Sequence, residues 1–128
     1  MINAKDAYAD IELSTDVLSA SNHRLIQLLL DKCTSHIESS KKYISNNDIA
    51  KKAKAIEKAL AILSYLRICL NHDNEQTKKL SELLDSLYAY SQNNLVQANI
   101  KNDVKYLNEA HHVMVNIKSG WDGISGVV

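Results

Sequence analysis

The sequence predicts an all-α protein, an antiparallel up-down four-helix bundle with an N-terminal capping segment. Residues 1–119 contain neither glycine nor proline, the two strongest helix breakers. Over most of that stretch, apolar residues recur at the three- and four-residue intervals of a helix with one buried face. We expect residues 1–128 to form a single domain. Within it, we expect 1–20 to be the cap, 22–119 the four helices and 120–128 a flexible tail.

Clusters of Asn, Asp and Ser mark the turns, because no stronger turn-forming residue is present before residue 120. Each cluster ends in a residue suited to cap a following helix. Asp73 and Gln76 have the spacing of a capping box, and Ser21 is the expected cap of the first long helix. The helices that these turns separate are predicted at 22–45, 48–70, 74–100 and 103–119.

The last three predicted helices each carry an apolar stripe, and short connections place such helices antiparallel to their sequence neighbours. The stripe of the second helix contains Ile49, Ile56, Leu60, Leu63, Leu66 and Leu70. The stripe of the third contains Leu80, Leu83, Leu84, Leu87, Leu95 and Ala98. The stripe of the fourth contains Leu107, Ala110, Met114, Ile117 and Trp121.

The second helix has a surplus apolar stripe, formed by Ile62, Tyr65 and Cys69 beside the first. A helix that is apolar nearly all round needs cover on more than one side. Either the bundle is irregular, with this helix at its centre, or another segment covers the second stripe. The candidate cover is residues 1–20, whose apolar side chains include Tyr8 and Ile11.

A partner-binding groove is therefore predicted on the surplus stripe, where the N-terminal cap would pack in the free protein and a partner would displace it. The alternative is that Ile62 and Tyr65 are ordinary core residues. The predicted partner-binding residues are Tyr8, Ile11, Leu28, Leu29, Ile62, Tyr65, Tyr88 and Leu95.

The charge balance disfavours nucleic acid as a partner. Fifteen basic residues match fifteen acidic ones, whereas nucleic-acid binders usually carry a positive excess. The lysines between Lys41 and Lys58 are interrupted by Asp48 and Glu57. They are interpreted as a solvated helix face, with a weak docking patch for an acidic partner as the alternative.

The chain is expected to be cytoplasmic and not inserted in a membrane. Its start lacks a basic segment followed by an apolar run, and its longest apolar stretch, 59–70, is too short to span a bilayer. Cys33 and Cys69 lie in apolar stripes without metal-binding spacing, so both are predicted to be small core residues in a reducing compartment.

No metal, cofactor or catalytic site is predicted. Glu109 and His112 have the Glu-x-x-His spacing of a di-iron bundle, but such a site needs a second motif and two further glutamates. None of the usual metalloprotease, phosphate-binding or nucleophile motifs is present. An enzyme is therefore not expected.

Several short strings, taken together, resemble the flagellin-specific export chaperones of bacterial flagella, the FliS family. They occur in the family's order over almost the entire chain. The distinctive set is Leu87-Tyr88-Ala89-Tyr90, then Leu95-Val96-Gln97-Ala98-Asn99, then Asn102-Asp103. Earlier strings are Ala7-Tyr8, Val17 to Ser21, Leu25 to Asp31 and Leu70 to Asp73, and Ile117 with Trp121 closes the series.

The resemblance implies a cytosolic chaperone that holds the disordered C-terminal segment of flagellin. It would prevent premature polymerisation and assist delivery to the export apparatus, with the flagellar export gate as a further partner. It also implies an N-terminal segment that covers part of the flagellin-binding surface. A structural or adaptor bundle that binds another amphipathic partner is the alternative function.

Overall fold

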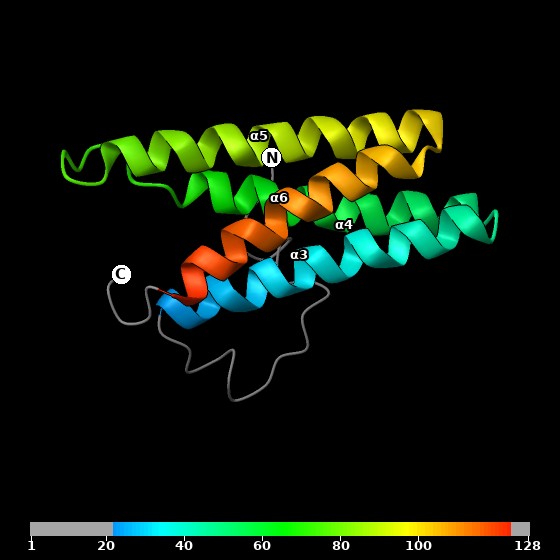
Figure 1. Cartoon of the computed structure of the whole chain (residues 1–128), viewed down its shortest axis with the longest axis horizontal. Coiled ribbons are helices and arrows are strands. Elements are labelled where there is room, and N and C mark those ends of the chain that lie inside the picture. The colour runs from blue at the N-terminus through cyan, green and yellow to red at the C-terminus, as the bar shows by residue number, and fades with distance from the viewer. Residues whose placement is uncertain (1–21, 124–128) are drawn as a thin grey trace.

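A computed structural model of the chain describes residues 22–123, which form four helices and no strand (Figure 1). The helices are α3 (Asn22–Ser45), α4 (Ile49–Ile68), α5 (Lys78–Lys101) and α6 (Val104–Asp122). The predicted all-α fold is confirmed. The expected cap at 1–20, with the Ser21 cap of the first helix, lies outside the described residues.

The four helices form a ring around one core. Helix α3 packs against α4 and α6, and α5 packs against the same two helices (Figure 1). Along the contact between α3 and α6, Glu38 meets His111 and Gln27 meets Asp122. The earlier residue of α3 thus pairs with the later residue of α6, so these two helices are antiparallel.

Side-chain caps fix two of the helix starts as predicted. The Asp48 carboxylate accepts the Lys51 backbone N–H at 3.2 Å, and the Asp103 carboxylate accepts the N–H of Lys105 at 3.0 Å. Each bond satisfies a backbone donor that has no partner in the first turn of a helix. The left-handed conformation of Asn102, with φ of 51°, ends α5 just before the second cap.

The predicted start of α5 at residue 74, with a capping box from Asp73 to Gln76, is wrong. The side-chain oxygens of Asn71 and Asn74 accept the N–H groups two residues further on, each at 2.9 Å. These turns hold the backbone out of the helical conformation, which asparagine commonly does before a helix. Helix α5 therefore begins only at Lys78.

Helix α6 extends beyond the predicted end at 119 and continues to Asp122. Trp121 accounts for the extension, because it packs against the core and its indole Nε1 donates to the His23 carbonyl at 3.0 Å. Residues 120–122, which we expected to be flexible, are thus helical.

The core confirms most of the predicted stripes. On α6, Leu107, Ala110, Met114 and Ile117 are buried, and on α4, Ile56, Leu63 and Leu66 are buried. Two predicted stripe residues of α5 lie on the surface instead: Leu80 is 48% exposed and Leu83 is 55% exposed. Their exposure leaves an apolar surface at the start of α5.

Two further predictions about burial are wrong. Cys69 is exposed because α4 ends at Ile68, one residue before it. Lys52, which we assigned to a solvated face, is buried with only 2% exposure. Its ammonium donates to the Asn99 carbonyl at 2.9 Å and to the Asn102 side-chain oxygen at 2.6 Å. It thereby places a positive charge at the C-terminal end of α5, where carbonyl groups lack helical partners.

Candidate protein-binding surface

The predicted partner-binding residues fall into three groups. Leu29, Ile62, Tyr88 and Leu95 are buried in the core. Leu28 and Tyr65 are half-buried. Tyr8 and Ile11 lie outside the described residues. The role of all eight as partner contacts stays a prediction.

Tyr88 illustrates how fully the core members are desolvated. The side chain is 3% exposed, and burial raises the pKa of its phenol. The phenol therefore stays neutral throughout the physiological range. A partner could reach such a residue only if the bundle opened locally.

An open groove lies between α3 and α4, and Leu28 and Tyr65 lie beyond its lining residues along the two helices. Leu28 precedes Lys32 by one helical turn and Tyr65 follows Lys58 by two turns, and both lysines line the groove. These two residues are therefore the members of the predicted site that a partner could contact without rearrangement of the core.

A second groove, more apolar, lies between α5 and α6. It has a volume of about 460 Å³. Its apolar walls are formed by Leu80, Leu84, Leu87, Val113, Ile117 and Trp121. We call it the α5–α6 groove. Exposed apolar surface of this kind commonly marks a binding site in a small protein.

Gly120 keeps one end of the α5–α6 groove open. It lines the groove, and a Cβ atom added there would meet no heavy atom within 4 Å. The missing side chain therefore leaves space that a partner's side chain could fill.

Trp121 is held in place at the same end of the groove. Its ring stacks on that of His23, with centroids 5.0 Å apart and planes inclined by 12°. Together with the hydrogen bond to the His23 carbonyl, this contact fixes the indole as a rigid wall. Rigid aromatic side chains lose little entropy on binding, which favours their use at interfaces.

The sequence did not reveal this groove, because Leu80, Leu84 and Leu87 have the spacing of a core stripe. The one sequence feature that could have indicated the groove is the Gly120-Trp121 pair at the end of the last helix. A glycine inside a helix costs about 1 kcal/mol relative to alanine, so its presence there calls for a packing or binding explanation.

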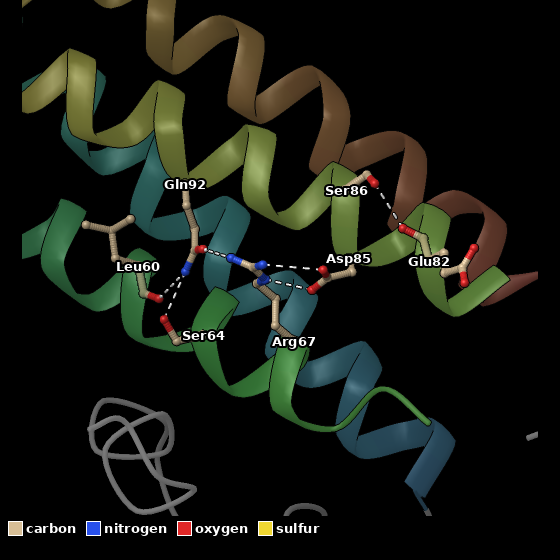
Figure 2. A network of polar contacts seen from close by, with 7 residues as sticks. All are labelled: Leu60, Ser64, Arg67, Glu82, Asp85, Ser86 and Gln92. Atoms are coloured by element: carbon tan, nitrogen blue, oxygen red, sulfur yellow. Dashed lines mark hydrogen bonds and ion pairs between the residues drawn. The ribbon is translucent and has the colours of Figure 1, made fainter. Parts of the chain in front are cut away.

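A polar network joins α4 to α5 on another side of the bundle, and Figure 2 shows its members. Arg67 donates to both carboxylate oxygens of Asp85, at 2.7 and 3.3 Å, and to the Gln92 side-chain oxygen at 2.9 Å. Gln92 in turn donates to the Ser64 hydroxyl at 2.9 Å. The network fixes the position of α5 on α4 (Figure 2).

The ion pair between Arg67 and Asp85 shifts the pKa values of both groups. The hydrogen bond from Arg67 holds the pKa of Asp85 below its usual value, and the same bond raises the pKa of Arg67. Both groups are therefore charged at neutral pH. Because each remains more than a third exposed, the pair contributes modestly to stability.

Glu109 and His112, the pair with di-iron spacing, have other partners. The Tyr90 hydroxyl donates to Glu109 at 2.9 Å, and His112 pairs with Asn116 at 3.3 Å. Within residues 22–123, no group of three or more His, Cys, Asp or Glu side chains could hold a metal ion. In that same part of the chain, every helix is too short or too polar to cross a membrane.

Comparison with known proteins identifies the family. The family model described as flagellar protein FliS matches residues 3–127. The chain belongs to the FliS family. The resemblance seen in the sequence is thereby confirmed. FliS proteins are chaperones and not enzymes, which also confirms the expectation that the chain is not an enzyme.

Several curated FliS relatives are similar to the chain over most of their length. The flagellar secretion chaperone FliSB of Pseudomonas aeruginosa is 36% identical over 124 residues, which cover 97% of each chain. FliS of Salmonella typhimurium is 32% identical over 120 residues, or 93% of this chain and 87% of the relative. FliS of Bacillus subtilis is 31% identical over 105 residues, or 82% and 76%.

Proposed function

We propose that this FliS chain is a cytoplasmic export chaperone for flagellin. It binds the disordered C-terminal segment of flagellin, prevents premature polymerisation and assists delivery to the flagellar export apparatus. The observation that carries the proposal is the α5–α6 groove in a chain whose relatives are flagellar secretion chaperones.

The shape of this surface suits a disordered partner. Leu84 and Leu87 on one wall and Val113, Ile117 and Trp121 on the other are spaced by one helical turn or close to it. A partner segment can insert apolar side chains at the same spacing, as amphipathic helices do in hydrophobic grooves. Ordering a disordered segment costs free energy, so an extended contact is needed to compensate.

The contact therefore extends, in this proposal, beyond the α5–α6 groove to Leu28 and Tyr65 beside α3 and α4. Residues 1–20, through Tyr8 and Ile11, cover part of this second surface until flagellin displaces them. The core residues Leu29, Ile62, Tyr88 and Leu95 join the contact only where the bundle opens. The flagellar export gate is proposed as the receiver of the complex.

The test is co-purification with full-length flagellin, compared with flagellin that lacks its C-terminal segment. The first should be retained and the second lost. Tyr65→Asp should weaken retention while preserving the melting temperature, because a half-buried residue can turn its carboxylate to water. Ile62→Asp is the matched control and should unfold the bundle, since Ile62 is fully buried.

Equal retention of both flagellins would contradict the C-terminal specificity. Retention of neither flagellin, by a chain that is folded and binds another amphipathic segment, would favour the adaptor bundle. Loss of folding in Tyr65→Asp would show that Tyr65 belongs to the core and not to the partner surface.

A further inference from the structure

The groove between α3 and α4 is lined by lysines over its length. Lys32, Lys54 and Lys58 line it, and Lys51 stands at its end. The space measures about 490 Å³. We call it the lysine groove.

Within residues 22–123, three of the four lysines have no carboxylate partner. Lys51 forms a long ion pair with Asp48, at 3.8 Å. Among residues 22–123, no carboxylate pairs with Lys32, Lys54 or Lys58. Lys54 and Lys58 are also four residues apart on one helix, a spacing at which like charges repel each other. This repulsion between the described lysines is relieved when a negative group enters the groove.

The acidic residues of the two helices face away from the lysine groove. Asp31 and Glu38 face α6, where Asp31 pairs with Lys118 at 2.9 Å and Glu38 with His111 at 3.0 Å. Glu57 lines a different hollow, the one between α4 and α5. The acidic residues of α3 and α4 therefore lie away from these lysines, which favours a positive potential in the groove.

The groove also contains neutral hydrogen-bonding groups. The hydroxyl-bearing residues Ser35, Ser39 and Tyr43 line its α3 wall. Hydroxyls and ammonium groups together suit carboxylates, which accept several hydrogen bonds. A space of this size between two helices has room for the side chains of one peptide strand. Its lining contains two ring side chains, Tyr43 and His36, whereas binding of single-stranded nucleic acid stacks successive bases on a series of aromatic residues.

Leu28 lies one turn before Lys32 and Tyr65 two turns after Lys58, so both apolar residues lie beyond the same end of the lysine groove. We propose that the lysine groove binds an acidic stretch of the flagellin C-terminal segment, one that adjoins the apolar residues held by Leu28 and Tyr65. This inference rests on the proposed function and adds to it a charge requirement on the partner. The lysines would set the register of the bound segment and speed its capture.

The test compares two pairs of lysine substitutions that change the net charge equally. Lys54→Gln with Lys58→Gln removes two of the groove's charges, and Lys101→Gln with Lys105→Gln removes two exposed lysines outside its lining, at the end of α5 and the start of α6. In about 50 mM salt, where surface charges are weakly screened, the groove variant should bind the flagellin segment about tenfold more weakly than the parent. The control should change affinity by less than about twofold, and both differences should vanish near 500 mM salt.

A second measurement does not depend on flagellin. A short oligoglutamate peptide is titrated against the full chain and backbone amide NMR shifts are recorded, with oligoglutamine as the neutral control. The shifts should cluster at the lysine groove, and Lys54→Gln with Lys58→Gln should abolish them. A short single-stranded oligonucleotide is titrated in parallel.

The outcomes distinguish a failure of the lysine-groove inference from a failure of the proposed function. Flagellin binding that is equally strong in the groove variant would overturn the inference and leave the proposed function intact. Oligoglutamate shifts at the groove without flagellin binding would support an acidic peptide site and overturn the proposed function. Tighter binding of the oligonucleotide than of oligoglutamate would overturn the acidic-peptide assignment.

Discussion

Trp121 and His23 connect the end of the last helix to the start of the first described one. The indole Nε1 donates to the His23 carbonyl at 3.0 Å, and the two rings stack at 5.0 Å. The contact joins residues that are 98 positions apart in the sequence. It stabilises the end of the bundle and at the same time forms one wall of the α5–α6 groove.

Replacing Trp121 should therefore affect stability and binding together. Trp121→Ala should lower the free energy of unfolding by about 2 kcal/mol, less than for a fully buried aromatic residue, because the indole is half-buried. Trp121→Phe keeps an aromatic side chain and loses the hydrogen bond, so the free energy of unfolding should fall by about 1 kcal/mol. Urea unfolding followed by circular dichroism measures both. A Trp121→Phe variant as stable as the parent would contradict the hydrogen-bond contribution, and equal losses in the two variants would contradict the packing contribution of the ring.

Lys52 should be needed for the stability of the α5 C-terminus. Lys52→Met keeps much of the buried stem but removes the donor to Asn99 and Asn102, so the free energy of unfolding should fall by about 1–2 kcal/mol. Lys51→Met, at an exposed neighbour, is the control and should stay within about 0.5 kcal/mol. Native-state hydrogen exchange should show the loss first at 99–102. A uniform loss over all helices would argue against a local role.

The Arg67–Asp85 pair should make stability depend on pH. Asp85→Asn should cost about 0.5–1 kcal/mol at pH 7, as expected for a partly exposed pair. The hydrogen bond from Arg67 lowers the pKa of Asp85 in the folded state. The contribution is therefore complete above the unfolded pKa of about 3.9 and is lost as the pH falls through the lower folded value.

Urea unfolding of the parent and of Asp85→Asn between neutral pH and about pH 3 measures this dependence. The difference between them should be constant above about pH 5 and shrink below about pH 4. Glu75→Gln, at an exposed residue of the α4–α5 turn, is the control and should show no such trend. A difference that grows on acidification would contradict the assignment.

Gly120→Leu should block the α5–α6 groove without harming the fold. The open space around Gly120 accommodates the side chain, and replacing glycine within a helix removes an entropic cost of about 0.5–1 kcal/mol. Binding of the flagellin C-terminal segment should weaken by at least about tenfold, equivalent to the loss of one buried apolar anchor. Calorimetric titration measures it.

The control for this variant is Ser119→Leu, which adds the same side chain at an exposed neighbour that does not line the groove. Its affinity for flagellin should match the parent. If both leucine variants bound as tightly as the parent, the groove would not be the docking site.

Removal of residues 1–20 should tighten flagellin binding. A segment that competes for the partner surface subtracts its own docking free energy from the observed affinity. Hydrogen exchange of these residues with and without flagellin, together with the affinity of the truncated chain, measures the effect. Free exchange in both states with unchanged affinity would exclude a cover. Weaker binding would make residues 1–20 partner contacts.

The sequence by itself determined the fold class and most helix boundaries. The absence of Gly and Pro before residue 120 and the caps at Asp48 and Asp103 are local properties. They depend on residues a few positions apart, so they could be predicted without knowledge of the packing. The α6 stripe from Leu107 to Trp121 could be predicted for the same reason.

Only the tertiary structure decided which apolar and charged residues are buried. Leu80 and Leu83 have core spacing but lie on the surface, whereas Lys52 is buried because the end of α5 supplies two acceptors. Burial depends on which helix packs against a residue and where that helix ends. Neither can be predicted from the sequence of the residue's own helix. The α5–α6 groove and the separation of charge around the lysine groove could not be predicted from the sequence for the same reason. Each is formed by two helices that pack together.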